Sequence, residues 1–124
     1  MAEALISNKI LPFTLKGRLL GGAMFHASIR QTPYGIIAYI ADEDLVGRAF
    51  VDEERQVYVI VSEKNYGGAL IGEKEAEQVL AQADYLVLTG ERIVNLAVKA
   101  GIVHPDSILY VKGIPHAHVI KMRM

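Results

Sequence analysis

The sequence predicts an α+β domain, a two-layer sandwich in which two helices pack on one face of a mainly antiparallel sheet. Segments with strand alternation come first, two segments with helical periodicity follow, and strand-like segments then return. This order differs from the regular strand–helix alternation that builds a parallel sheet. The chain has 124 residues, of which 52% are hydrophobic and 22% charged. Both values are typical of one globular domain.

The first half of the chain is predicted to supply strands. Phe25, Ala27 and Ile29 alternate with polar residues, which is the pattern of a strand with one polar face. After a turn at 32–35, residues 36–41 are apolar on both faces, so we expect them at the centre of the sheet. Residues 49–51 and 56–61 are predicted to form a hairpin.

Two amphipathic helices are predicted at 73–84 and 91–100. In the first, Ala76, Val79, Leu80 and Ala83 repeat at helical spacing, and the second repeats apolar residues in the same way. Thr89 is expected to cap the second helix. Residues 85–88 form either a short apolar link or a strand. Residues 108–112 and 116–121 are predicted as closing strands, with a turn at 113–115 between them.

Residues 1–23 differ from the rest. They hold three basic residues and one acidic residue, whereas residues 24–124 hold 10 basic and 13 acidic ones. The segment also lacks a clean period. We therefore expect a loosely attached basic extension at 1–23 and a single α+β domain at 24–124, with Met24 as the natural start. The alternative is a basic arm that contacts RNA or a protein partner.

Composition excludes several classes of function. The chain has no cysteine, which excludes disulfides, thiolate nucleophiles and Cys-ligated zinc. A net charge of −1 gives no general attraction to nucleic acid, and no DNA-binding signal is found. No apolar run approaches the roughly 20 residues of a membrane helix, so we expect a cytoplasmic protein with no membrane partner. No nucleophile elbow, phosphate loop or dinucleotide motif occurs, and no cofactor is expected.

Two histidines are the first candidates for chemistry. His116 and His118 should share one face of a strand and could chelate a metal if a third ligand joined them. Paired strand histidines are more often ordinary surface residues, so we assign no metal site. The acidic run at 42–44 offers oxygen ligands for a hard cation, but we favour a helix start that uses acids to satisfy its own amides.

Two glycine-containing segments are candidates for ligand binding. Tyr66, Gly67 and Gly68 combine an aromatic ring with backbone amides that could converge on an anion. Gly90 opens a helix whose N-terminus favours anions, and Arg92 would add a planar donor group. The alternative is that these glycines simply form turns.

Four motifs in order resemble a known family. They are residues 42–50 (DEDLVGRAF), 66–68 (YGG), 90–92 (GER) and 113–117 (GIPHA). Together they are similar to archaeal domain-of-unknown-function family 424 over about residues 24–121. The resemblance implies a compact α+β cytosolic protein of archaea with no assigned activity, associated with translation and RNA-processing proteins. Val87 stands where the family usually has Asn, and His118 where it tends to have Gln.

Three functions remain open from the sequence. The favoured one is a non-catalytic module that binds RNA or a ribonucleoprotein through Tyr66, Gly67, Gly68, Gly90, Arg92 and His116. The second is a small hydrolase or phosphate-ligand enzyme that uses His116 with a carboxylate. The third is a structural subunit that binds protein partners. If the candidate residues share a function, the fold should bring them together.

Overall fold

The computed structural model describes residues 24–121. The strands are β1 (Met24–Thr32), β2 (Gly35–Asp42), β3 (Ala49–Asp52), β4 (Val57–Ile60), β5 (Ala69–Gly72), β6 (Tyr85–Thr89), β7 (Leu109–Val111) and β8 (Ile114–Ile120). The helices are α2 (Glu63–Tyr66), α3 (Glu73–Gln82) and α4 (Glu91–Lys99), with short 3-10 turns η1 (Glu43–Leu45) and η2 (Pro105–Ser107). The extension predicted at 1–23 lies outside the described residues, so the prediction that Met24 is the natural start stays a prediction.

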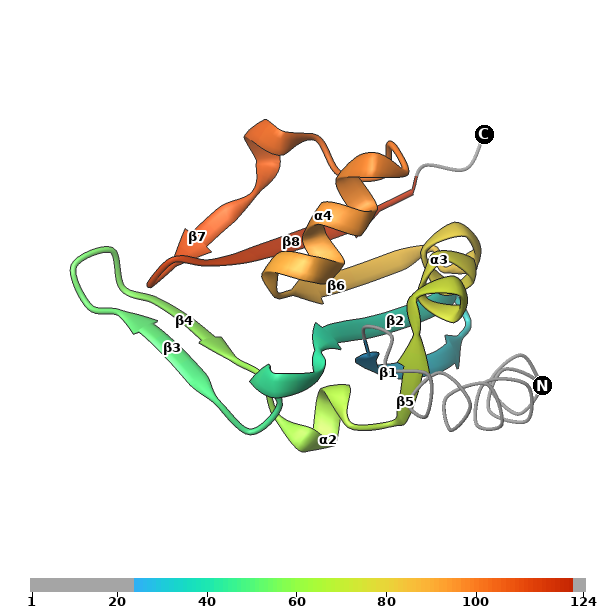
Figure 1. Ribbon diagram of the computed structural model, residues 1–124, viewed down its shortest axis with the longest axis horizontal. Helices are drawn as coiled ribbons and strands as arrows, with labels where there is room; N and C mark the ends of the chain where they lie inside the picture. Colours follow the sequence, from blue (N-terminus) through green and yellow to red (C-terminus); the bar gives the residue numbers. More distant parts are fainter. Residues whose placement is uncertain (1–23, 122–124) are drawn as a thin grey trace.

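Six strands form one sheet in the order β5-β1-β2-β6-β8-β7, and β3 and β4 form a separate hairpin. All neighbours in the large sheet are antiparallel except β2 and β6, which run parallel. Helices α3 and α4 pack on one face of this sheet, and the hairpin projects from its end (Figure 1). The predicted α+β sandwich with a mainly antiparallel sheet is therefore confirmed.

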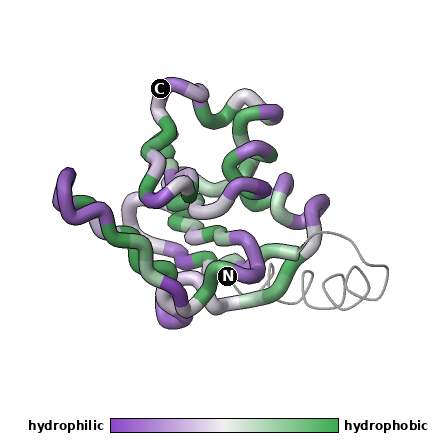
Figure 2. Tube along the Cα trace, turned by 60° about the vertical axis from the view of Figure 1, so that its left-hand side comes forward, coloured by the Kyte–Doolittle hydropathy of each residue, from purple (hydrophilic) through white to green (hydrophobic). Residues whose placement is uncertain are grey.

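The sheet is covered differently on its two faces. On the helix face, apolar residues of β1, β2 and β6 meet α3 and α4, and the fully buried members include Phe25, Ile40, Leu80, Leu88 and Ile93. On the other face a smaller core forms where the hairpin and α2 close over one end of the sheet. Its buried members are Ala41, Leu45, Phe50, Val59, Val61, Tyr66 and Val111. Figure 2 shows hydrophobic residues concentrated along the strands.

The two long helices lie close to their predicted positions, but the cap of α4 does not. Its N-cap residue is Gly90, and no side chain of that residue can cap it. The carboxylate of Asp42 instead accepts hydrogen bonds from the amides of Arg92 and Ile93. The predicted cap at Thr89 is thus wrong, because Thr89 ends β6 and its hydroxyl is hydrogen-bonded to Tyr66 and His116. The acids at 42–44 are predicted to satisfy the amides of their own helical turn. The Asp42 side chain makes no such cap in η1 and instead caps α4.

Other local features differ from the prediction or complete it. Residues 65 and 66 belong to the short helix α2, which Ser62 caps by accepting a hydrogen bond from the Asn65 amide. The edge strand β5 was not predicted. Residues 85–88 lie in strand β6 between β2 and β8, which confirms the strand alternative. Ile114 and Pro115 belong to β8 rather than to the turn predicted at 113–115. Within residues 24–121, no helix is long and apolar enough to span a membrane.

Candidate functional site

A chain of polar side chains links the buried end of α2 to the surface of β8. The Tyr66 hydroxyl lies 3.1 Å from Thr89 Oγ1, which lies 2.8 Å from His116 Nδ1. His116 Nε2 in turn lies 2.8 Å from Nε2 of His118. Thr89 is fully buried and Tyr66 nearly so, whereas His118 is exposed. Residues from three separate elements therefore form one hydrogen-bonded row.

The direction of this row follows from the tyrosine. Among the described residues, Thr89 is the hydrogen-bond partner of the Tyr66 hydroxyl. A buried phenol that did not donate would carry a large desolvation cost, so Tyr66 donates to Thr89. The Thr89 hydroxyl then donates to Nδ1 of His116, which leaves the proton of that neutral ring on Nε2. His116 therefore donates to His118.

Burial keeps His116 and Tyr66 uncharged at neutral pH. Loss of solvation lowers the pKa of His116 to about 4, and the neighbouring His118 contributes in the same direction. Burial also raises the pKa of Tyr66 above its usual value of 10, although its bond to Thr89 opposes the shift. His116 is thus a neutral hydrogen-bonding group rather than a cation that could attract phosphate.

The exposed end of the row opens into a groove. Its volume is ≈ 400 Å³, and it lies between β4, β7 and β8. The residues that line it are Val57, Tyr58, Val59, Ser107, Leu109, His116 and His118. None of these is Asp, Glu, Lys or Arg, and the groove combines apolar walls with the polar groups of Ser107 and the two histidines.

The glycines of the Tyr66 motif have a packing role in this fold. A Cβ on Gly68 would lie 2.6 Å from the carbonyl oxygen of Ala27, so the chain after α2 passes directly against β1. A Cβ on Gly67 would lie 2.6 Å from the Glu63 carbonyl oxygen. Both contacts are closer than a side chain allows, which explains why glycines occupy these positions. The structure brings Tyr66 and His116 together, while Gly67 packs against Glu63 of α2 and Gly68 packs against β1.

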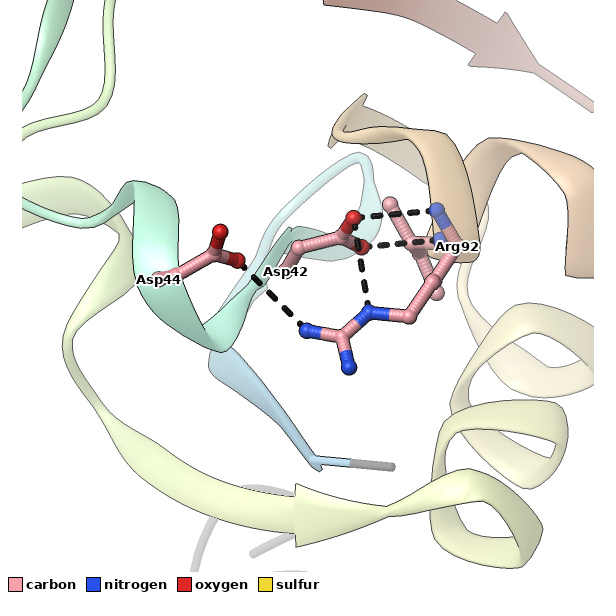
Figure 3. A network of polar contacts seen from close by, with 4 residues as sticks. Asp42, Asp44 and Arg92 are labelled. Carbon is pink, nitrogen blue, oxygen red and sulfur yellow. Dashed lines mark hydrogen bonds and ion pairs between the residues drawn. The ribbon is translucent and has the colours of Figure 1, made fainter. Parts of the chain in front are cut away.

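Arg92 belongs to a second polar cluster, with Asp42 and Asp44 (Figure 3), and Gly90 lies directly against Asp42. Gly90 has φ +124°, and a Cβ there would lie 2.4 Å from the Asp42 carboxyl carbon. This space lets Asp42 reach the amides of α4. The Arg92 side chain turns back to Asp42 at 3.7 Å and to Asp44 at 3.5 Å. Burial raises the pKa of Asp42, while the two amides and Arg92 oppose that shift. Arg92 is therefore engaged by carboxylates.

The face of the sheet opposite the helices carries two aligned rows of side chains. In the first row, Arg30 pairs with Ile37, Ile37 with Tyr85, and Tyr85 with Ile120. Arg30 and Ile120 are exposed, and Ile37 and Tyr85 are half-buried.

The second row lies closer to the hairpin. It runs through Ser28, Tyr39, Val87 and His118. Paired residues on neighbouring strands project to the same face. The next residues toward the hairpin, Ala41, Thr89 and His116, lead into the hydrogen-bonded row. We call the eight residues of the two rows the open sheet face, at whose border Tyr39 and Val87 also pack against the smaller core.

Sequence reasoning missed most of this arrangement. Thr89 was assigned to a helix cap, and His118 was set aside because the family tends to have Gln there. Tyr58, Tyr39 and Tyr85 carry no motif. Tyr39 and Tyr85 alternate with residues of the helix-side core, which indicates that they lie on the opposite face of the sheet. The strand order is also needed to show that the two tyrosines lie on neighbouring strands.

The chemistry at His116 differs from the hydrolase expectation. Its ring contacts Thr89 and His118, not a carboxylate. Within the described part of the chain, no three His, Cys, Asp or Glu side chains gather closely enough to hold a metal ion. The arrangement therefore offers stacking surfaces and neutral hydrogen bonds.

Comparisons with known proteins agree with the fold. The crystal structure of an uncharacterized conserved protein from Methanopyrus kandleri superimposes with a TM-score of 0.63 at 20% identity, covering 82% of this chain and 96% of that one. At this identity the likeness concerns the fold alone. No curated protein matches the chain. The family model of DUF424, described as a protein of unknown function, matches residues 29–122. Since this match spans most of the chain, the protein belongs to the DUF424 family.

Proposed function

We propose that the protein is a non-catalytic module that binds single-stranded RNA on its open sheet face. The observation that carries the proposal is the alignment of planar side chains there. Tyr85 stands in the first row, and Tyr39 and His118 stand in the second. Aromatic side chains on a sheet offer platforms on which unpaired bases stack.

The charges near this face suit a nucleic acid. Its two rows contain no Asp or Glu, and they include Arg30, whose guanidinium lies 5.9 Å from the centroid of the Tyr39 ring. Arg30 also donates to the Lys64 carbonyl oxygen at 3.2 Å, which places α2 and its lysine beside the row. Glu63 adjoins Lys64 in α2, so Arg30 is the cation that this face itself presents to a backbone with one charge per nucleotide.

Eight of the 13 acidic residues in 24–124 form three groups away from the two rows. Three are in α3 in the helix layer, two are in η1, where Asp44 pairs with Arg92, and three occupy the hairpin tip. The three groups are Glu73, Glu75 and Glu77; Glu43 and Asp44; and Asp52, Glu53 and Glu54. The negative balance of the domain is thus compatible with RNA on the open sheet face.

The test is a fluorescence anisotropy titration of a labelled 12-nucleotide single-stranded RNA pool. Tyr85→Ala removes one stacking ring and should weaken binding about 5- to 100-fold. Tyr85→Phe keeps the ring and should bind like the unmodified protein. Tyr110→Ala is the matched control, because Tyr110 is 53% exposed but lies on β7 outside this face.

Two outcomes would contradict the proposal. One is an affinity that is the same for the single strand and for a duplex of the same sequence, which would indicate charge attraction alone. The other is equal binding by Tyr85→Ala and Tyr110→Ala. Binding to a purified protein partner that Tyr85→Ala abolishes, with no RNA binding, would favour the structural-subunit alternative.

A further inference from the structure

The groove between β4, β7 and β8 has the chemistry of a site for an uncharged planar ring. Tyr58 is 63% exposed and His118 is exposed, so both rings are open to solvent. Val57, Val59 and Leu109 supply apolar walls. A phosphate placed there would meet no lysine or arginine among the lining residues, and its desolvation would go uncompensated.

Hydrogen-bonding groups are also present in the groove. Three consecutive residues, 57–59, line it, so the β4 backbone contributes to its wall. In the described sheets β4 pairs with β3 and with no other strand, which leaves one edge whose alternate N–H and C=O groups are unpaired. Ser107 donates its hydroxyl proton to the His104 carbonyl at 2.8 Å, so its oxygen is free to accept. Such groups can read the edge of a base.

The groove is continuous with the open sheet face. His118 lines the groove and is also the last residue of the second row, beside Val87. The hydrogen bond from His116 holds this ring at the junction of the two surfaces. A strand of RNA that lies across the sheet therefore reaches the groove without leaving the surface.

We propose that this groove is a pocket for one nucleobase, which stacks on the Tyr58 and His118 rings while the β4 edge and Ser107 contact its polar edge. The inference rests on the proposed RNA-binding function and names the part of the ligand that the groove takes. Its volume of ≈ 400 Å³ falls in the range of small-molecule sites, which is about 300–1,000 Å³.

The experiment is a titration of the full chain with uncharged nucleosides, followed by two-dimensional amide NMR. Adenosine, guanosine, cytidine and uridine are added separately, and inorganic phosphate serves as the comparison. At least one nucleoside should shift amides of 57–59, 107–109 and 116–118 in a saturable manner, whereas phosphate should leave them unchanged. Nucleoside shifts confined to other regions, or groove shifts caused by phosphate, would overturn the proposal.

Variants connect the pocket to RNA. Tyr58→Ala and His118→Gln should each weaken nucleoside binding about 5- to 100-fold and weaken RNA binding by a similar factor. Tyr110→Ala, which removes a similarly exposed tyrosine outside the lining, should change neither. Tyr85→Ala should weaken RNA binding but leave the nucleoside affinity intact, because Tyr85 lies outside the groove.

The outcomes separate the two proposals. RNA binding that depends on Tyr85 but not on Tyr58 or His118 overturns the pocket and keeps the proposed function. Saturable nucleoside binding in the groove without RNA binding by the full chain supports the pocket and overturns the proposed function. Displacement of a nucleoside by an extended peptide at lower concentration than by RNA would assign the β4 edge to a protein strand and overturn the nucleobase site.

Discussion

The carboxylate of Asp42, at the end of β2, accepts a hydrogen bond of 2.9 Å from the amide of Arg92, 50 residues later at the start of α4. A second bond of 2.9 Å comes from the Ile93 amide. One buried side chain thus satisfies two amides that no intrahelical carbonyl can reach. It also fixes the helix end directly above the parallel pair of β2 and β6.

Removing this carboxylate should destabilise the fold. We expect Asp42→Ala to lower the free energy of unfolding by about 1–3 kcal/mol, because the helix loses its cap and two amides are left without a partner. Chemical denaturation followed by circular dichroism measures the change. Asp44→Ala is the control. Its side chain is 73% exposed and its ion pair with Arg92 contributes little, so an equal loss there would contradict the capping role.

Gly90 should tolerate no side chain. Gly90→Ala places a Cβ 2.4 Å from the Asp42 carboxyl carbon in a backbone with φ +124°. We expect the free energy of unfolding to fall by more than about 2 kcal/mol, since backbone strain and displacement of the Asp42 cap both destabilise the fold. Gly47→Ala has φ +92° with nothing within 4 Å of its Cβ, so it reports strain alone. Similar losses in the two variants would mean that the Asp42 contact is unimportant.

Truncation of the leucines in the two long helices should destabilise the fold to different extents. Leu80 is fully buried, whereas Leu96 is half-buried at the rim of the same core. Leu80→Ala should cost about 2–5 kcal/mol of unfolding free energy, and Leu96→Ala should cost less, because its removal leaves a smaller cavity. Thermal or urea unfolding of the two variants tests the order. A larger loss at Leu96 would contradict the packing described here.

Whether a feature of this fold can be predicted from the sequence depends on how far apart in the chain its interacting residues lie. Both long helices and the first two strands follow from local periodicity, which needs no knowledge of partners. The cap of α4 could not be predicted, because Asp42 is 50 residues away and Thr89 has the residue type of a good cap. The short strand β5 has four residues, too few for its alternation to stand out from an adjacent glycine-rich loop.

The candidate site shows the same limit. Tyr66 and His116 could be named from motifs, yet the residue that joins them, Thr89, has no motif and is defined by its place between β2 and β8. The glycines at 67 and 68 looked like an anion-binding loop, but the close approach to β1 that requires Gly68 is a tertiary contact. The open sheet face depends on strand order and register, neither of which a single sequence fixes.

The hydrogen-bonded row should make stability depend on pH. The pKa of His116 falls from 6.5 to about 4 in the folded protein, so between these values the unfolded chain binds more protons than the folded one. The contribution of this group is therefore fully present above about pH 6.5 and is lost as the pH falls toward 4. Urea unfolding at intervals from pH 7.5 to 4.5 should show a decline in unfolding free energy.

The control separates His116 from the carboxylates that also titrate toward pH 4. His116→Gln keeps a neutral side chain that can bond to Thr89 but cannot take up this proton. The unfolding free energy of the variant should therefore decline less steeply between pH 6.5 and 5 than that of the unmodified protein. Direct titration of the His116 ring by NMR should give a pKa well below that of an exposed histidine. If the ring titrates near 6.5, or if the variant declines as steeply as the unmodified protein, the neutral donor row from Tyr66 to His118 is not the state that the folded protein maintains.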